Sequence, residues 1–141
     1  MRPFREGIVV FKADALYYGR YVGTGTNSPI WDFTRISDEI GCIGARSITN
    51  IGTSVIFVGK SDIYSFDGTR PQSITAGISD QIRGILTDGT ASARLGHDKL
   101  NNSVWIGKGA LSGTYVWNYA LNRWGLLASG VGMIFCDTNV D

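Results

Sequence analysis

Cysteine, proline and histidine are scarce in this chain of 141 residues, which has two, three and one of them, respectively. Two cysteines cannot build the disulfide framework on which small secreted domains depend. Cys42 and Cys136 both stand among apolar residues, so we expect buried free thiols. Three prolines beside 19 glycines exclude a low-complexity linker and favour a globular chain with many tight turns.

An excess of charge and a long hydrophobic run are also missing. The chain has 13 Lys and Arg against 12 Asp and Glu, so its net charge of +1 gives no reason to expect non-specific nucleic-acid binding. No apolar run approaches the ~20 residues of a membrane helix, and residues 1–6 lack the apolar core of a signal peptide. We therefore expect a soluble protein, or part of a soluble assembly, without a membrane partner.

A repeat is the most informative feature that the sequence does contain. Three strand-like blocks end in lysine at a spacing of 48 residues, at 8–12, 56–60 and 104–108. The pair Ala45-Arg46 returns as Ala93-Arg94 at the same spacing. A repeat of this length that is carried by strands is typical of the four-stranded blades of a β-propeller. One blade cannot cover its own apolar faces, so each needs a neighbour.

These patterns predict an all-β fold, a partial β-propeller of about three four-stranded antiparallel blades in one domain of residues 1–141. The predicted units are residues 7–37, 45–76 and 92–128. The second unit is the clearest, because residues 54–59 are apolar on both faces, as in a strand between two layers. The pair Asp67-Gly68 predicts a hairpin in the same unit. We expect Val58, Trp105 and Ile106 to be core residues at equivalent places in successive units.

Two segments stand outside this pattern. The first unit lacks an innermost strand, because its expected position falls before Met1, and residues 131–137 form a strand without a unit of their own. We expect this tail strand to fill the gap across a subunit boundary and to close a homo-oligomer. The closing residues are Val131, Met133, Ile134 and Phe135. Residues 79–88 carry a helical apolar stripe that starts at a capping serine, so we predict one short helix there.

The residues that could carry chemistry are few. His97 precedes Asp98 at a predicted turn, and no serine or cysteine has a recognisable nucleophile setting, so we expect an exposed turn histidine. Five aspartates adjoin strands without resembling an EF-hand loop, and we expect them to form turn hydrogen bonds. They are Asp14, Asp62, Asp67, Asp98 and Asp137. The sequence thus predicts no catalytic residue, no cofactor and no bound metal.

Contacts with partners are a second possibility for exposed side chains. Lys12, Lys60 and Lys108 end equivalent strands and should share one rim, either as a basic ring that faces a polyanion or as a solubility device. The four tryptophans and six tyrosines could stack on sugars or bases, although their positions on strands favour packing between units. Trp124, beside Arg123 at an outer hairpin, is the best candidate for an exposed partner contact.

Several short motifs, taken together and in order, resemble a family of bacteriophage and prophage virion proteins. The matching segments are Trp31 to Phe33, Ser37 to Gly44, Ser47-Ile48, Val55 to Gly59, Tyr64 to Gly68, Pro71, Val116 to Tyr119 and Arg123 to Gly125. They cover most of residues 7–128. The family consists of β-propeller components of short tails, at the hub or nozzle that continues the channel below the portal, and its members are much longer than this chain.

The resemblance implies a structural role in tail assembly and in DNA retention or passage, without catalytic residues. The implied partners are other copies of the chain, other tail or portal-adaptor proteins, and DNA that passes non-specifically through a channel. The implied locations are the virion tail and, during assembly, the bacterial cytoplasm.

Two other classes of function stay open from the residues alone. A glycan- or protein-binding propeller module would use exposed Trp and Tyr side chains. A glycosidase-like enzyme would need two carboxylates about 5 to 10 Å apart in a pocket, and none of the 12 acidic residues stands out as such a pair.

Overall fold

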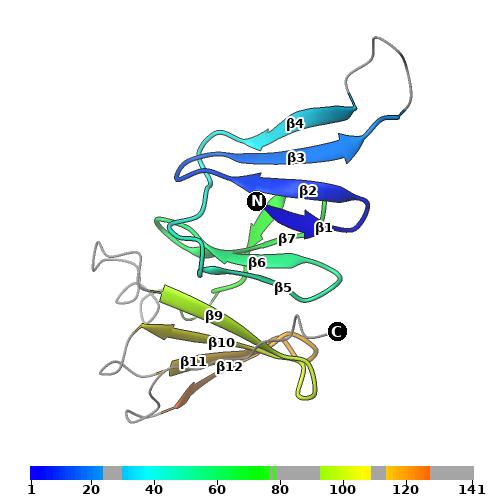
Figure 1. The fold of residues 1–141 in the computed structure, drawn as a ribbon. Helices are drawn as coiled ribbons and strands as arrows, with labels where there is room; N and C mark the ends of the chain where they lie inside the picture. The colour runs from blue at the N-terminus through cyan, green and yellow to red at the C-terminus, as the bar shows by residue number, and fades with distance from the viewer. Residues whose placement is uncertain (24–29, 77, 79–92, 109–113, 128–141) are drawn as a thin grey trace.

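The protein is all-β in a computed structural model, which stacks three four-stranded antiparallel sheets in chain order (Figure 1). The structure describes residues 1–23, 30–76, 78, 93–108 and 114–127. None of these residues lies in a helix, so no helix in the described ranges could span a membrane. The predicted helix at 79–88 and the predicted tail strand at 131–137 lie outside the described residues.

Each sheet is a meander in which every strand pairs with the next along the chain. The first sheet contains β1 (Arg2–Phe4), β2 (Gly7–Phe11), β3 (Leu16–Tyr21) and β4 (Trp31–Ser37). The second contains β5 (Ile48–Asn50), β6 (Val55–Val58), β7 (Ile63–Phe66) and β8 (Pro71–Ser73). The third contains β9 (Ala93–Asp98), β10 (Ser103–Lys108), β11 (Thr114–Asn118) and β12 (Arg123–Leu127). The predicted all-β class and the three sheets of four strands are confirmed.

Tight turns at predicted positions shape these meanders. Gly68 has φ 107° in the hairpin between β7 and β8, the left-handed conformation that glycine adopts without steric cost. Asn102 and Asn122 both have φ 51° immediately before β10 and β12, and asparagine tolerates this conformation better than most residues. The Asp67-Gly68 hairpin therefore lies where the sequence places it.

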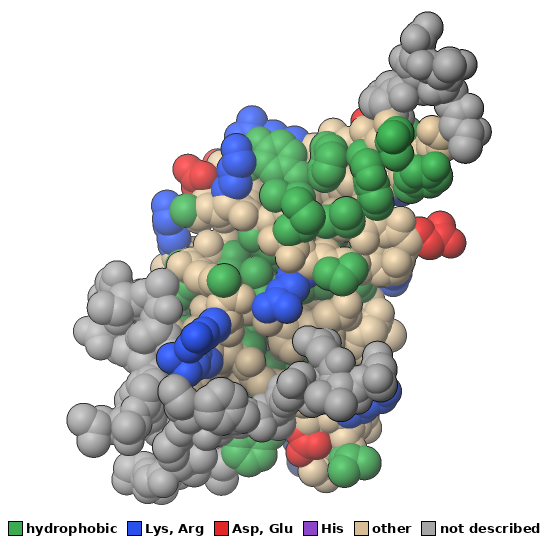
Figure 2. Space-filling view, viewed as in Figure 1, with side chains coloured by type: hydrophobic (Ala, Val, Ile, Leu, Met, Phe, Trp, Pro, Cys, Tyr) green, Lys and Arg blue, Asp and Glu red, His purple; other side chains and the backbone are tan. Residues whose placement is uncertain are grey.

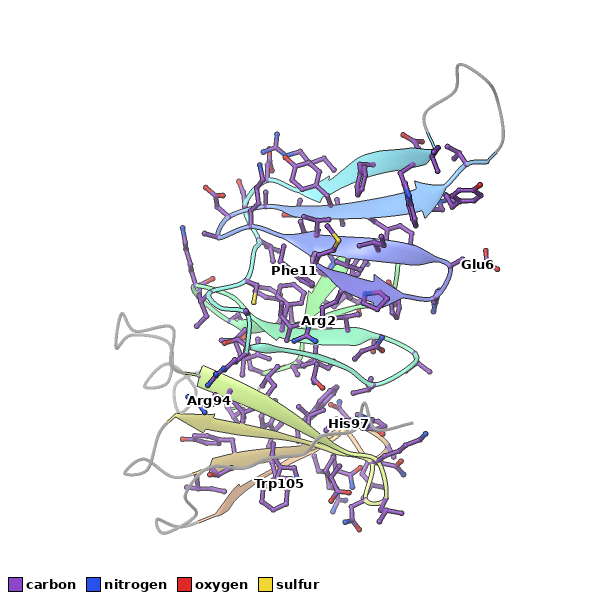
Figure 3. The ribbon with its side chains drawn as sticks, in the orientation of Figure 1. Arg2, Glu6, Phe11, Arg94, His97 and Trp105 are labelled. Atoms are coloured by element: carbon purple, nitrogen blue, oxygen red, sulfur yellow. The ribbon has the colours of Figure 1, made fainter. Side chains whose placement is uncertain are left out.

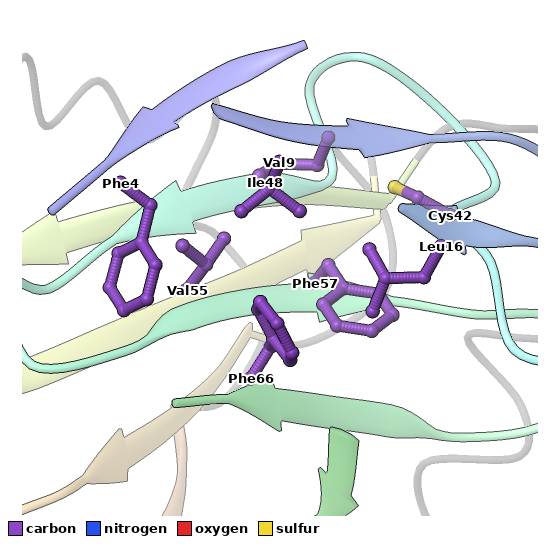
Figure 4. Close-up of a cluster of buried hydrophobic side chains, with 8 residues drawn as sticks. All are labelled: Phe4, Val9, Leu16, Cys42, Ile48, Val55, Phe57 and Phe66. Atoms are coloured by element: carbon purple, nitrogen blue, oxygen red, sulfur yellow. The ribbon is translucent and has the colours of Figure 1, made fainter. Parts of the chain in front are cut away.

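The core lies between the sheets and consists of two clusters that share β6. Val55 and Phe57 of β6 join the cluster against the first sheet, which also contains Phe4, Val9 and Leu16 (Figure 4). The alternate residues of β6 face the other way, because successive side chains of a strand point to opposite faces. These residues, Ile56 and Val58, pack with Val104, Ile106 and Trp117 of the third sheet. The prediction of a strand that is buried on both faces is confirmed.

The first sheet is complete, which corrects the expectation that its innermost strand is missing. Arg2–Phe4 forms β1 and pairs with β2 in the register Arg2 to Val9 and Phe4 to Gly7. Only Arg5 and Glu6 separate β1 from β2, whereas residues 51–54 separate β5 from β6. Because this hairpin is shorter, the first strand falls after Met1, at Arg2–Phe4. The tail therefore does not supply the first strand of the first sheet.

The spacing of 48 residues does not relate equivalent faces of the sheets. Ile56 and Val104 are 48 residues apart, yet both enter the cluster between the second and third sheets and so point toward each other. Trp105 follows Val104 and points away from the second sheet (Figure 3). It belongs to neither buried cluster, so its prediction as a core residue is wrong, whereas Val58 and Ile106 are fully buried.

The first strands of the three sheets lie next to one another. The Asn50 side-chain amide donates to the Pro3 carbonyl at 3.1 Å, which joins β5 to β1. The buried Ser47 hydroxyl donates to the Ala93 carbonyl at 2.6 Å, and Leu95 N donates to the Arg46 carbonyl at 3.1 Å. These bonds align β1, β5 and β9, and the first hairpin of every sheet lies at the same end of the stack (Figure 1).

Candidate functional site

His97 is buried in β9 and is not the exposed turn residue that we expected. Its side chain is only 5% exposed, because it shares the face of β9 that carries Ala93 and Leu95 toward the second sheet. The ring atom Nε2 lies 2.9 Å from the Tyr119 hydroxyl, which is 3.4 Å from Asn102 Oδ1. Burial lowers the pKa of His97 below its usual value, although nearby Asp98 acts in the opposite direction.

This arrangement gives His97 a structural role within the third sheet. Within the described ranges, the partner recorded for its ring is a tyrosine whose pKa is raised by burial, and no serine, cysteine or carboxylate pairs with it. The ring instead connects β9 to the residue that follows β11.

Two of the aspartates, Asp67 and Asp98, form local turns, as predicted. Asp67 accepts from Thr69 N at 3.0 Å and from the Thr69 hydroxyl at 2.6 Å, and these bonds lower its pKa. Asp98 accepts from Leu100 N at 3.1 Å and from the Asn101 amide at 2.7 Å. Among the described residues, no three His, Cys, Asp or Glu side chains form a group that could hold a metal ion.

Asp62 has a larger structural task than a local turn. Its carboxylate accepts from Ile63 N at 2.7 Å, from the Ser73 hydroxyl at 2.6 Å and from the Thr75 hydroxyl. These bonds attach the turn before β7 to the end of β8 and to the buried Thr75 beyond it. The recorded hydrogen-bond donors to this carboxylate are one backbone N–H group and two side-chain hydroxyls.

The three rim lysines, Lys12, Lys60 and Lys108, lie at or just after the ends of β2, β6 and β10. β2, β6 and β10 all run back from the first hairpins, so Lys12, Lys60 and Lys108 lie at the opposite end of the stack (Figure 1). Lys12 and Lys60 are exposed, and Lys12 Nζ lies 5.4 Å from the centre of the Tyr17 ring. Their role as partner contacts stays a prediction.

Trp124 joins two sheets and is not the exposed contact that we expected. It is half-buried, and its Nε1 donates to the Ile74 carbonyl at 2.9 Å across the gap between the third and second sheets. Its ring stacks on Trp117 with the centroids 6.1 Å apart. Arg123 is exposed, and the role of Arg123 and Trp124 as partner contacts stays a prediction. The closing residues predicted in the tail, Val131 to Phe135, lie outside the described ranges.

The two cysteines have different outcomes. Cys42 is a buried free thiol, as predicted, whose Sγ donates to the Gly44 carbonyl at 3.1 Å and whose pKa is raised by burial. Cys136 lies outside the described residues.

An aromatic face, which the sequence reasoning did not identify as a surface, covers the side of the first sheet that is turned away from the second sheet. We define it by Ile8, Val10, Tyr17, Tyr21, Trp31 and Phe33, which share this side because they alternate with inward residues such as Val9. Tyr21 is 55%, Trp31 36% and Phe33 49% exposed. Figure 2 shows hydrophobic side chains gathered over the first sheet.

The aromatic face is ordered by contacts within the sheet. The rings of Tyr21 and Trp31 meet edge to face with their centroids 5.8 Å apart. The Phe33 ring lies on Gly19, where an added Cβ would come within 2.4 Å of it. The signal in the sequence was the alternation of aromatic and polar residues in 31–35, but alternation cannot tell which sheet ends the stack.

The sequence matches no protein-family model and no curated protein.

Proposed function

We propose that the chain is a structural virion protein of a phage tail, a hub- or nozzle-like partial β-propeller that acts in tail assembly and in DNA retention or passage. The three sheets are its blades in this proposal. A second copy supplies three further blades, which gives six, a count within the range of known propellers.

The aromatic face is the single observation that carries this proposal. It leaves Tyr21, Trp31 and Phe33 exposed on one side of a sheet whose other side is packed. Contiguous exposed apolar surface of this kind marks a site of association rather than a solvated end. A sheet laid against it would repeat the contacts that the first and second sheets already make.

The relative arrangement of the three sheets supports a propeller over other ways of stacking sheets. All three sheets are meanders in chain order, their first strands lie together, and their first hairpins lie at one end (Figure 1). Blades around a central channel share these properties. The motifs of residues 31–71 and 116–125 add the resemblance to tail proteins.

Electron microscopy of the purified protein tests the proposal. We expect ring-shaped particles with a central channel, and we expect the chain to co-purify with tail particles of the phage that encodes it. Particles without a channel, or absence of the chain from purified tails, would count against the tail function.

A glycan-binding module is the second candidate, because Tyr21 and Trp31 expose aromatic rings that could stack on sugar rings. The two proposals differ in what covers the aromatic face. A glycan array probed with the purified protein should be blank if the face is covered by another sheet. Binding that is lost in Trp31→Ala would favour the glycan-binding module.

A further inference from the structure

Two leucines project from the hairpin turns of the third sheet. Leu100 lies between β9 and β10 and is 94% exposed, and Leu121 lies between β11 and β12 and is 67% exposed. Both turns lie at the same end of the sheet, because β9 and β11 are each antiparallel to β10 and so run in the same direction. We call these two residues the leucine tips.

Hydrogen bonds fix the turns that carry the leucine tips. The N–H groups of the two leucines donate to Asp98 Oδ1 and to Asn118 Oδ1, at 3.1 Å and 3.0 Å, respectively. The turns are also bonded to each other, because Tyr119 N donates to the Asn102 carbonyl at 3.0 Å. The backbone of both turns is therefore held in place next to the other turn, while the leucine side chains face solvent.

The corresponding turns of the second sheet have no exposed large apolar side chain. Gly52 and Thr53 are at the turn between β5 and β6, and residues 67–70 form the turn between β7 and β8. Glycine and short polar residues are the usual components of tight turns. The four-stranded meander therefore does not require leucine at these positions, and the leucine tips need another explanation.

Basic side chains flank the leucine tips. Lys99 directly precedes Leu100, Arg123 follows two residues after Leu121, and both basic residues are exposed. Asp98 is the acidic residue of the two turns, and its oxygens accept bonds from within its own turn, one of them from the Asn101 amide at 2.7 Å. The surface around the leucine tips therefore presents two positive charges to a partner.

Exposed apolar tips with basic neighbours fit the surface of an anionic bilayer. A rigid protein partner would need one pocket for each leucine at a matching distance, whereas a bilayer deforms around each side chain. Surface binding to a bilayer grows with the buried apolar area and with the attraction to anionic lipids. That attraction strengthens binding about fivefold for each Lys or Arg near the surface.

We propose that this end of the third sheet is a membrane-surface contact. Leu100 and Leu121 insert at the boundary between headgroups and acyl chains of an anionic bilayer, and Lys99 and Arg123 bind its lipid phosphates. This inference goes beyond the proposed function and does not rest on it. The expectation of no membrane partner came from the lack of a spanning run, which binding to a bilayer surface does not require.

Co-sedimentation of the full chain with unilamellar vesicles of phosphatidylcholine and phosphatidylglycerol tests the contact. We expect saturable binding by the unchanged protein. The variant L100S/L121S should bind at least about tenfold more weakly, because burial of one leucine side chain contributes about that factor or more. Vesicles of phosphatidylcholine alone should bind the unchanged protein about 30-fold more weakly, because two basic residues lose their attraction. No binding by the unchanged protein, or full binding by L100S/L121S, would overturn the inference.

Two further variants make the test specific. Leu126 is 61% exposed but lies within β12 and not at a turn, so Leu126→Ser removes an exposed leucine and should bind vesicles as the unchanged protein does. K99Q/R123Q should lose the preference for anionic vesicles and keep the weaker binding to phosphatidylcholine. Melting temperatures check that every variant is folded. An equal loss of binding in Leu126→Ser and L100S/L121S would contradict the assignment to the leucine tips.

The outcomes separate this inference from the proposed function. A ring-shaped tail protein that does not bind vesicles would refute the membrane contact and leave the tail function standing. Vesicle binding through the leucine tips by a chain that never assembles would support the membrane contact and count against the tail function.

Discussion

Single side chains in this protein take their environment from the strand face on which they lie. Val104 and Ile106 are fully buried, while Trp105 between them belongs to neither core cluster. His97 is buried, while its neighbour Asp98 accepts bonds in an exposed turn. Chain position alone could not separate these pairs, because the same alternation fits either face until the partner sheet is known.

The pH dependence of stability should report the burial of His97. Its pKa is lowered in the folded state from the ordinary 6.5, so the unfolded chain binds more protons between these two values. Stability is therefore fully present above pH 6.5 and falls as the pH is lowered through this interval. Thermal unfolding between pH 7.5 and 5 should show the decrease, above the range in which carboxylates titrate.

The variant His97→Gln controls for other titrating groups. It keeps a hydrogen-bonding group near Tyr119 but removes the titration, so its melting temperature should be flat over the same pH range. An identical pH dependence in the variant would show that another group is responsible.

Two phenylalanines on different faces should respond differently to truncation. Phe57 is fully buried between the first and second sheets, so Phe57→Ala should lower the free energy of unfolding by about 3–5 kcal/mol. Phe33 is 49% exposed on the aromatic face, so Phe33→Ala should cost about 1 kcal/mol or less in the single chain. Urea unfolding measures both, and equal costs would contradict the assignment of faces.

At the scale of strands and turns, the sequence predicted more than it did for single residues. The predicted units 45–76 and 92–128 match the second and third sheets to within a few residues, because alternation and turn residues are local signals. The missed strand, β1, has only three residues and is joined to β2 by a two-residue turn. The identical spacing of the lysines concealed that Ile56 and Val104 lie on opposite faces of their sheets. A shift of register by one residue moves every side chain of a strand to the other face of the sheet.

Gly41 marks the close crossing of the connection from the first to the second sheet. A Cβ there would lie 2.1 Å from the Lys12 carbonyl oxygen, a backbone atom that cannot move aside easily. Gly41→Ala should therefore lower the free energy of unfolding by about 1–3 kcal/mol or more. Gly125 in β12 is the control, because a Cβ there meets nothing within 4 Å. Gly125→Ala should be neutral or stabilise by about 0.5–1 kcal/mol, and a similar loss in both variants would contradict the account.

At the scale of the whole molecule, the sheets differ in how many of their faces are covered. The second sheet is covered on both faces by its neighbours, and the first sheet on one. The sequence could predict that blades need neighbours, but the identity of the uncovered face follows only from which residues pack inward.

The central claim is that the aromatic face is covered by another copy of the chain. Sedimentation equilibrium over a wide concentration range tests it most directly, with Phe33→Asp as the variant that places a charge on this face. The account predicts a mass of twice the 15.3 kDa chain for the unchanged protein, and the mass of a single folded chain for the variant. A single-chain mass for the unchanged protein at every concentration, or a dimer that Phe33→Asp leaves intact, would contradict it.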